Sequence, residues 1–121
     1  MTISPDFQPV FAGLRAILQP YAPHLTVKHD LDDLYYLDGP YSQKFKRELF
    51  FGSTQVKKNY VSFYLMPVYM YPELLETISP GLKKHMQGKS CFNFKHVDEA
   101  LFEELAGLTQ RGYDRFKQET A

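Results

Sequence analysis

The segment YVSFYLM, residues 60–66, constrains the fold more than any other part of the sequence. In a β-strand, successive side chains point to opposite faces of the sheet. One face of this segment is entirely apolar and carries Val61, Phe63 and Leu65. The other face combines aromatic rings with polar tips and carries Tyr60, Ser62, Tyr64 and Met66. The apolar face predicts contact with a hydrophobic core, whereas the second face requires either another layer or partial contact with water.

Other strands are predicted where apolar and polar residues alternate, or where a short aromatic run lies between turn residues. They lie around Leu25 and Val27 and over residues 34–37, 48–56 and 91–94. The segments 48–56 and 60–66 form a predicted hairpin that turns at residues 57–59. Asp32-Asp33 is expected to turn the chain between the first two strands, and Asp38-Gly39-Pro40 to end the second. Residues 41–47 are interpreted as a loop or a short helix.

Helices are predicted where a capping residue precedes a proline, or where apolar residues recur at helical spacing. The predicted helices span residues 5–18, 72–87 and 98–117. Ser4-Pro5 and Ser79-Pro80 each combine an N-cap residue with a first-turn proline, so the second helix is expected to restart at Ser79-Pro80. Asp98 is expected to cap the last helix. Gly88 is interpreted as the C-cap of the second helix.

Four successive strands between helices predict an α+β fold of two layers, a mainly antiparallel sheet with helices packed on one face. The chain has 121 residues, 44% of them hydrophobic, and neither a linker nor a repeat divides it. This length is typical of one domain with its own core, so residues 1–121 are expected to form a single domain. The expected core contains Phe11, Leu14, Val61, Phe63, Leu65, Leu101, Leu105 and Leu108.

The formal net charge is zero. This value argues against a dedicated nucleic-acid binder, because such proteins usually carry a basic excess. Bases outnumber acids nine to three over residues 41–97, and this basic middle either forms one positive face or is neutralised by the acidic ends. The single cysteine, Cys91, excludes an intrachain disulfide and fits a reducing compartment. Because neither a signal-peptide pattern nor an apolar run of about 20 residues occurs, we expect a cytoplasmic protein that does not enter the membrane.

Acids and histidines gather between residues 24 and 38, and they permit two interpretations. Carboxylates and imidazoles are possible iron ligands, and this segment contains His24, His29, Asp30, Asp32, Asp33 and Asp38. Alternatively, the acids are solvated and shape the end of a hairpin. A calcium loop is excluded, because Tyr35 stands where that loop requires glycine. We expect neither a bound metal nor a cofactor.

The sequence contains no known catalytic signature, and Cys91 is the one candidate nucleophile considered. His85 or His96 could serve as its base, provided that the thiol is exposed in electropositive surroundings. The alternative is that Cys91 enters the core with its strand, where a lone cysteine packs as an inert apolar group.

Tyrosines in and beside the segment 60–66 predict a ligand site. We expect a partly exposed groove, because a tyrosine ring offers apolar contact while its hydroxyl tolerates water. The tyrosines expected to line this groove are Tyr60, Tyr64, Tyr69 and Tyr71. Lysines that could flank it are Lys58, Lys84 and Lys89. Their charge would favour an anionic or aromatic ligand, or an acidic patch on a partner protein. The alternative is that the helical segment 72–87 covers these tyrosines, which then belong to ordinary packing.

Three segments resemble the YdhG-like family of small bacterial domains of unknown function: NYVSFYLMPVY, PELLETISPGLKKHMQGKSCFNF and ELAGLTQRGYDRF. They contain a strand that ends in proline, a proline-started helix, a G-K-S turn before an F-x-F strand, and a last helix. The resemblance implies a two-layer α+β domain. It also implies a topology similar to frataxin in some relatives and an iron-chaperone function in one branch. Iron handling in frataxin-like domains is associated with an acidic first helix, whereas the helix expected here contains only Asp6.

From these patterns we expect a non-enzymatic domain that binds a small ligand or a partner protein, as a monomer or a homodimer. One alternative is an iron-binding chaperone of the frataxin-like kind. The other alternative is a cysteine-dependent enzyme.

Overall fold

The computed structural model describes residues 7–44 and 46–120, and its centre is a five-stranded antiparallel sheet. The strands follow one another across the sheet in chain order, so each pairs with its neighbour in sequence. They are β1 (Thr26–Asp30), β2 (Leu34–Ser42), β3 (Arg47–Val56), β4 (Val61–Leu65) and β5 (Cys91–Phe94). The α-helices are α1 (Gln8–Leu18), α2 (Met66–Met70), α3 (Pro80–Lys83) and α4 (Glu99–Thr120). Two 3₁₀ helices complete the fold, η2 (Gln19–His24) and η3 (Pro72–Thr77).

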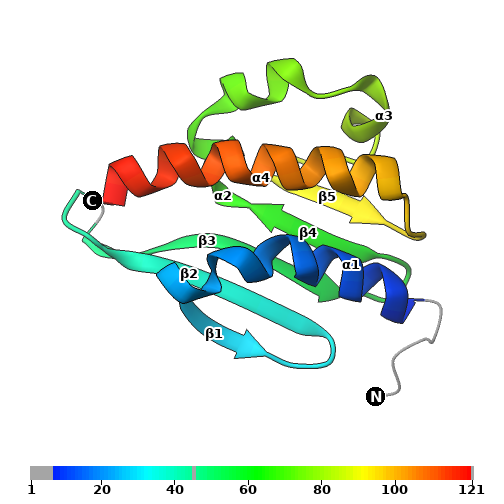
Figure 1. Cartoon of the computed structure of the whole chain (residues 1–121), viewed down its shortest axis with the longest axis horizontal. Helices are drawn as coiled ribbons and strands as arrows, with labels where there is room; N and C mark the ends of the chain where they lie inside the picture. The colour runs from blue at the N-terminus through cyan, green and yellow to red at the C-terminus, as the bar shows by residue number, and fades with distance from the viewer. Residues whose placement is uncertain (1–6, 45, 121) are drawn as a thin grey trace.

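The helices form a single layer on one side of the sheet (Figure 1). α1 and α4 lie next to each other across this face, and the short helices α2, η3 and α3 pack against α4. The predicted two-layer α+β architecture, with an antiparallel sheet and helices on one face, is therefore confirmed. The predicted start of the first helix at Ser4-Pro5 lies outside the described residues. None of the helices in the described part of the chain is long and apolar enough to cross a membrane.

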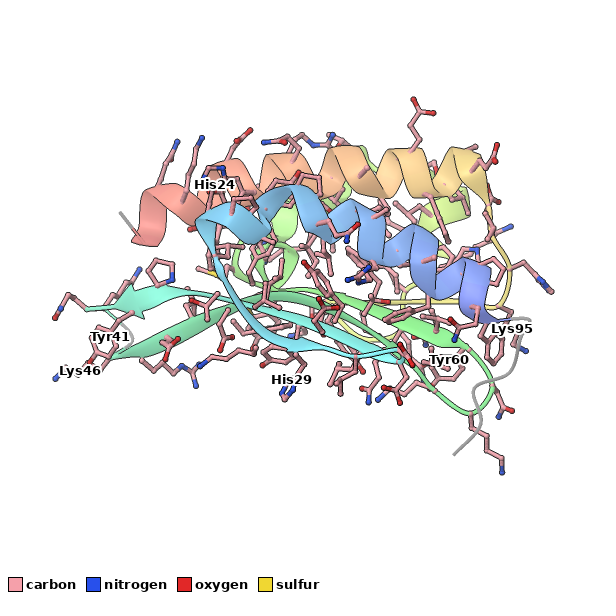
Figure 2. The ribbon with its side chains drawn as sticks, turned by 60° about the horizontal axis from the view of Figure 1, so that its bottom comes forward. His24, His29, Tyr41, Lys46, Tyr60 and Lys95 are labelled. Atoms are coloured by element: carbon pink, nitrogen blue, oxygen red, sulfur yellow. The ribbon has the colours of Figure 1, made fainter. Side chains whose placement is uncertain are left out.

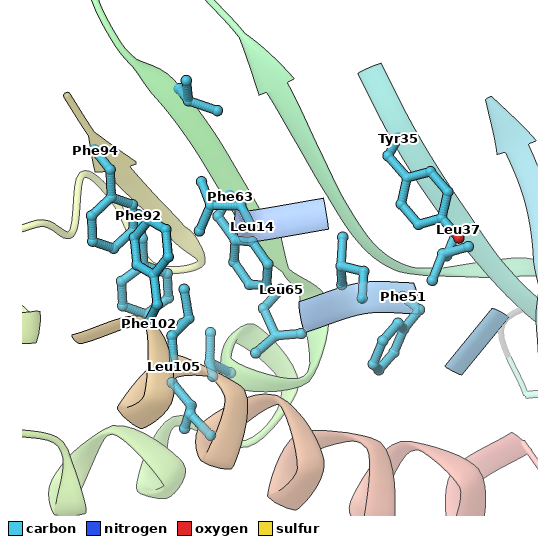
Figure 3. Close-up of a cluster of buried hydrophobic side chains, with 14 of the residues drawn as sticks. Leu14, Tyr35, Leu37, Phe51, Phe63, Leu65, Phe92, Phe94, Phe102 and Leu105 are labelled. Atoms are coloured by element: carbon cyan, nitrogen blue, oxygen red, sulfur yellow. The ribbon is translucent and has the colours of Figure 1, made fainter. Parts of the chain in front are cut away.

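The core lies between the sheet and the helix layer, and Figure 3 shows part of it. The three apolar residues of β4, Val61, Phe63 and Leu65, are fully buried, as their alternation predicted. Seven of the eight residues expected in the core are buried, and Leu101 is partly buried against it. The expected face assignment of β4 is therefore correct, and β4 holds the centre of the core.

The expected turn at Asp38-Gly39-Pro40 is wrong, because β2 continues through these residues to Ser42. The pairing of β2 with β3 shifts between Asp38 and Tyr41, which is the mark of a bulge. Proline lacks an amide hydrogen, and a bulge is one of the few places in a sheet where this loss is tolerated. Gly39 is buried beneath the ring of Phe116 in α4, so its missing side chain permits close packing rather than a turn.

The helical segment expected over residues 72–87 restarts at Ser79-Pro80 as predicted, because it is divided into η3 and α3. Its expected end is wrong, since α3 ends at Lys83. The next residues pair with β5 instead: the amide of Asn93 donates to the carbonyl of His85 at 2.8 Å, and the amide of Gln87 donates to the carbonyl of Cys91 at 2.9 Å. Pairing with β5 therefore gives the carbonyl of His85 and the amide of Gln87 the hydrogen bonds that a longer helix would otherwise provide. Gly88 is therefore not a helix cap; its φ of 83° belongs to the turn that leads into β5.

The expected N-caps of the last two helices are confirmed. The Ser79 hydroxyl accepts from the amide of Leu82 at 3.1 Å, and the Asp98 carboxylate accepts from the amide of Leu101 at 3.0 Å. Both caps satisfy amides that have no partner within their own helix.

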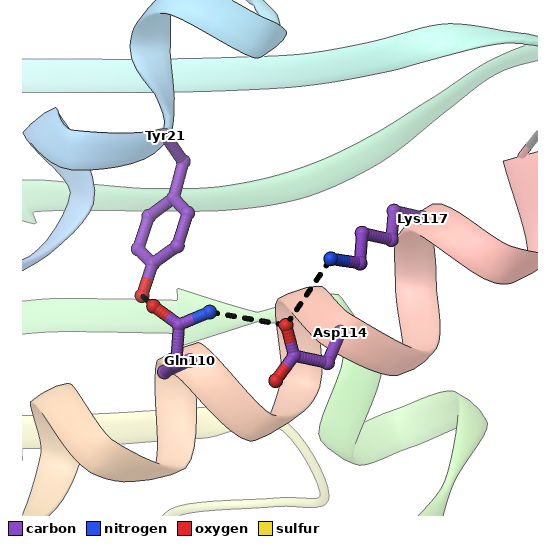
Figure 4. Close-up of polar contacts among 4 residues, drawn as sticks. All are labelled: Tyr21, Gln110, Asp114 and Lys117. Atoms are coloured by element: carbon purple, nitrogen blue, oxygen red, sulfur yellow. Dashed lines mark hydrogen bonds and ion pairs between the residues drawn. The ribbon is translucent and has the colours of Figure 1, made fainter.

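A polar chain connects η2 to α4 at the other end of the helix layer (Figure 4). The Tyr21 hydroxyl donates to Gln110 at 3.0 Å, and the Gln110 amide donates to Asp114 at 3.1 Å. Asp114 also lies 3.6 Å from the ammonium of Lys117. Burial, followed by the nearby Asp114 charge, raises the pKa of Tyr21, so this hydroxyl stays a donor at neutral pH. This series of polar contacts holds η2 against α4.

Candidate functional site

The face of the sheet opposite the helix layer is here called the open face. In Figure 2 the helices lie above the sheet, and the labelled His29 points down, away from them. Strand pairing aligns one row of open-face residues across all five strands: His29, Tyr36, Ser53, Tyr64 and Cys91. A second row crosses four strands: Leu34, Gln55, Ser62 and Asn93. Residues from distant parts of the sequence therefore meet on a surface that no described helix covers.

A shallow pocket of about 370 Å³ lies on this face and is here called the aromatic pocket. Its lining residues come from four strands and are His29, Leu34, Tyr36, Phe50, Ser53, Gln55 and Tyr64. The rings of Tyr36 and Phe50 are 4.8 Å apart between centroids, and the His29 ring meets Tyr36 edge-on at 5.7 Å. Ser53 is buried among these larger side chains. Rings therefore border the pocket, and a small hydroxyl residue lies between them.

The aromatic pocket also contains polar groups that the protein itself leaves unused. Within the described residues, the side chains of Tyr36, Ser53 and Gln55 form no hydrogen bond to another residue. Burial, followed by the charge of Asp38, raises the pKa of Tyr36, so its hydroxyl is protonated at neutral pH. These groups can therefore donate to, or accept from, a bound molecule.

A hydrogen-bonded group around Asn93 lies on the strand next to Tyr64, which lines the pocket. The side-chain oxygen of Asn93 accepts from Ser62 at 2.8 Å and from the Cys91 thiol at 3.3 Å, and its amide nitrogen donates to Gln87 at 2.7 Å. Cys91 pairs directly with Tyr64 across β4 and β5. The neighbourhood of Tyr64 is therefore ordered before any ligand arrives.

Cys91 does not enter the core, contrary to the packing interpretation, because Phe92 and Phe94 occupy the core-facing positions of β5. It lies half-buried on the open face beside Tyr64. Burial raises the pKa of its thiol, an effect that the nearby hydroxyls of Tyr64 and Ser62 reduce. A thiol with a raised pKa is mostly protonated at neutral pH, and the protonated form is a poor nucleophile.

Iodoacetamide should therefore label Cys91 more slowly in the native protein than in the urea-unfolded protein at the same neutral pH. The native rate should rise as the pH increases beyond the ordinary titration range of a cysteine thiol. Mass spectrometry of the alkylated protein over time gives both rates. A native rate equal to or above the unfolded rate would mean that Cys91 is an activated thiol.

Two hollows outside the aromatic pocket contain other residues of the expected site. A pocket of about 450 Å³, here called the basic pocket, is lined by Tyr60, His85, Asn93, Lys95, His96, Val97 and Asp98. A groove of about 620 Å³, here called the apolar groove, is lined by Val68, Tyr69, Pro72, Leu75, Met86, Gly88 and Lys89.

The structure distributes the expected ligand-binding residues over several places. Tyr60 lines the basic pocket and Tyr64 the aromatic pocket, whereas Tyr69 and Lys89 meet in the apolar groove. Tyr71 lies beneath the guanidinium of Arg115, 4.1 Å from the ring centroid. Lys58 and Lys84 are exposed and line none of these three hollows. The four tyrosines therefore do not share one groove.

The sequence predictions missed most of the aromatic pocket, namely His29, Tyr36, Phe50, Ser53 and Gln55. Leu34 and Tyr36 alternate with buried residues of β2, and this alternation was the available signal. The partners on β3 were not predictable in the same way, because bulges shift the pairing of β2 with β3.

The acids considered as iron ligands are dispersed. Asp30 pairs with Arg15 at 2.7 Å, Asp32 and Asp33 form the turn between β1 and β2, and Asp38 lies within β2. Among residues 7–44 and 46–120, no three His, Cys, Asp or Glu side chains are placed to hold a metal ion together. Asp32 and Asp33 follow the turn interpretation, whereas Asp30 and Asp38 lie within strands.

No protein-family model matches this chain, and no curated protein or solved structure is significantly similar to it. The resemblance to the YdhG-like family therefore stays a prediction from the sequence motifs. The α+β fold does not depend on that resemblance, because the sheet and the helix layer are observed directly.

Proposed function

We propose that this chain is a non-enzymatic binding domain that holds a planar nitrogen heteroaromatic ring in the aromatic pocket. The observation that supports this proposal is the combination of half-buried aromatic side chains with unused polar groups on one uncovered sheet face. These side chains do not contribute to the core, which lies on the opposite side of the sheet.

The aromatic walls favour a flat ligand. A planar ring can stack on Tyr36, Phe50 or Tyr64, and each aromatic pair contributes about 0.5–1.5 kcal/mol beyond the area that it buries. A volume of about 370 Å³ lies near the lower end of the usual range for small-molecule sites. One ring or two fused rings are therefore the expected size.

The polar groups favour a ring with nitrogen atoms over a hydrocarbon. The Gln55 amide offers a donor and an acceptor side by side, and the Ser53 hydroxyl offers either. The edge of a nitrogen heterocycle carries complementary donors and acceptors. A hydrocarbon ring would cover these protein groups without replacing their hydrogen bonds to water, which costs about 1–3 kcal/mol for each buried group.

Binding is proposed in preference to catalysis because of the state of Cys91. Its raised pKa disfavours the thiolate that covalent catalysis requires. Iron binding is not proposed, since the described residues contain no group of metal ligands.

Titration with adenine, followed by nuclear magnetic resonance, tests the proposal. We expect shifts of the amide signals of Ser53 and Gln55, and weaker binding of benzene-type rings without nitrogen. Tyr64→Ala should weaken adenine binding by about tenfold, because one stacking partner contributes about 1–3 kcal/mol per base. Thermal unfolding of this variant should stay close to that of the unmodified protein, since Tyr64 lies outside the core.

Tyr69→Ala is the matched control, because Tyr69 is 56% exposed and lies in the apolar groove. Its affinity for adenine should equal that of the unmodified protein. Two results would refute the proposal: no shift at Ser53 and Gln55 at millimolar adenine, or equal losses in the two tyrosine variants.

A further inference from the structure

The basic pocket collects side chains from three separate segments at one end of the sheet. Tyr60 precedes β4, His85 belongs to the segment between α3 and β5, and Lys95 to Asp98 connect β5 to α4. Figure 2 shows Tyr60 and Lys95 at the same end of the sheet, opposite the end that carries Tyr41 and Lys46. The volume of about 450 Å³ is large enough for a small organic molecule.

Several side chains that line this pocket can donate hydrogen bonds. Lys95 provides an ammonium, His85 and His96 provide imidazoles, and Tyr60 provides a hydroxyl. Within the described residues, the side chains of Tyr60, Lys95 and His96 have no hydrogen-bond or ion-pair partner. Donors that line one pocket and have no partner among the described residues favour an acceptor from outside.

His85 is held in one orientation. Its Nδ1 lies 2.8 Å from the carbonyl oxygen of Asn93, and because a carbonyl only accepts, this nitrogen carries the hydrogen. The ring also stacks on Phe94, with 4.5 Å between centroids and an angle of 20°. The Nε2 atom is therefore the ring nitrogen left for other contacts. A fixed ring loses little conformational entropy when a ligand binds.

Asp98 is the one acid that lines the basic pocket, and its carboxylate already accepts from the amide of Leu101 as the cap of α4. Its charge is therefore partly offset by the positive end of that helix. The ammonium of Lys95 and the two imidazoles therefore share the pocket with a single, partly neutralised carboxylate. The ring of Tyr60 and the side chain of Val97, which is 45% exposed, add apolar surface.

We propose that the basic pocket is a second binding site, which takes a small organic oxyanion: a carboxylate or phosphate group attached to an apolar or aromatic body. The oxyanion accepts hydrogen bonds from Lys95 and Tyr60, and the body packs against Tyr60 and Val97. Both kinds of oxyanion share this chemistry, so each is included in the test.

The basic pocket and the aromatic pocket have no lining residue in common. Tyr60 and Tyr64 are four residues apart, which corresponds to about 13 Å along an extended strand. A ring bound at Tyr64 does not occupy the space between Lys95 and Tyr60. If adenine does not bind, the proposal for the basic pocket is therefore not contradicted. If the anions do not bind, the proposal for the aromatic pocket is likewise not contradicted.

Calorimetric titration with three related probes tests the proposal: phenyl phosphate, benzoate and benzyl alcohol. The first two carry an oxyanion, whereas the third carries a similar apolar body without charge. Lys95→Gln is compared with Lys58→Gln, which removes the same charge from an exposed turn residue that does not line the pocket. Thermal unfolding checks that both variants are folded, as expected for two exposed lysines.

We expect at least one of the two anions to bind the unmodified protein and benzyl alcohol to bind at least tenfold more weakly. Lys95→Gln should weaken the binding of that anion by about tenfold, the usual effect of losing a charge-assisted hydrogen bond. Lys58→Gln should change it less than about twofold, because an exposed charge at a distance is largely screened. Tyr60→Phe should weaken it several-fold through the lost hydroxyl.

Three results would each overturn the proposal. The first is that neither anion binds. The second is that benzyl alcohol binds as tightly as the anions, which would mean that the pocket recognises only apolar groups. The third is that the two lysine variants lose equal affinity, which would indicate general attraction of anions to a basic surface. Binding of phenyl phosphate without benzoate would support the site and restrict it to phosphate groups.

Discussion

Phe63→Ala is expected to lower the free energy of unfolding by about 3–5 kcal/mol, the range found for fully buried aromatic residues. Phe63 lies in the middle of β4, between Thr54 of β3 and Phe92 of β5, and it is fully buried. The substitution removes a ring from the centre of the core, shown in Figure 3, and both the lost apolar burial and the resulting cavity destabilise the protein.

Urea denaturation, monitored by circular dichroism, measures this loss from the shift of the midpoint at constant slope. Tyr64→Ala is a suitable control, because Tyr64 is the next residue of the same strand and faces the open side. Its loss of stability should be clearly smaller. A loss below about 1 kcal/mol for Phe63→Ala, typical of surface substitutions, would mean that the face assignment of β4 is inverted.

Gly39→Ala is expected to destabilise the protein by about 1–3 kcal/mol, because the added methyl group has no space. A Cβ atom at residue 39 would lie 2.6 Å from Cζ of Phe116 and 2.9 Å from the carbonyl oxygen of Leu49. Neither neighbour can move easily. The Leu49 oxygen belongs to the backbone of β3, and the Phe116 ring is fully buried and packs on Phe51 at 5.1 Å between centroids.

Gly107→Ala provides the opposite control. Gly107 lies inside α4, and the atom nearest to a methyl group added there would be Nη1 of Arg111 at 3.6 Å, an ordinary contact. Alanine should therefore stabilise the helix by up to about 1 kcal/mol. The melting temperatures of both variants, measured by calorimetry, should move in opposite directions. An unchanged or raised melting temperature for Gly39→Ala would contradict the close packing of β2 beneath α4.

Several features were predictable because they depend on neighbouring residues alone. The alternation of Val61, Phe63 and Leu65 identified the core face of β4, since strand geometry fixes the direction of every second side chain. The caps at Ser79 and Asp98 were predictable for a similar reason, because a capping side chain reaches an amide only three residues away.

The candidate sites depend instead on contacts between distant residues. In the aromatic pocket, Tyr36 and Phe50 are neighbours because β2 and β3 pair through bulges. In the basic pocket, Tyr60 and His85 line the same hollow because the segment after α3 pairs with β5. A sequence pattern does not indicate which residues form a bulge or which segments pair with each other. The single groove expected for Tyr60, Tyr64, Tyr69 and Tyr71 assumed one continuous surface, whereas α2 begins at Met66 and redirects the chain after β4.

The sequence by itself determined that β3 and β4 are consecutive strands of a hairpin, which face of β4 is apolar, and where the last helix begins. The tertiary structure alone decided that Gly39 is a packing contact, that residues 85–87 join the sheet, and that aromatic side chains from four strands share an uncovered face. The physical reason is the range of the interactions. Backbone geometry and capping act within a few residues, whereas strand register, helix docking and burial follow from the free energy of the whole folded chain.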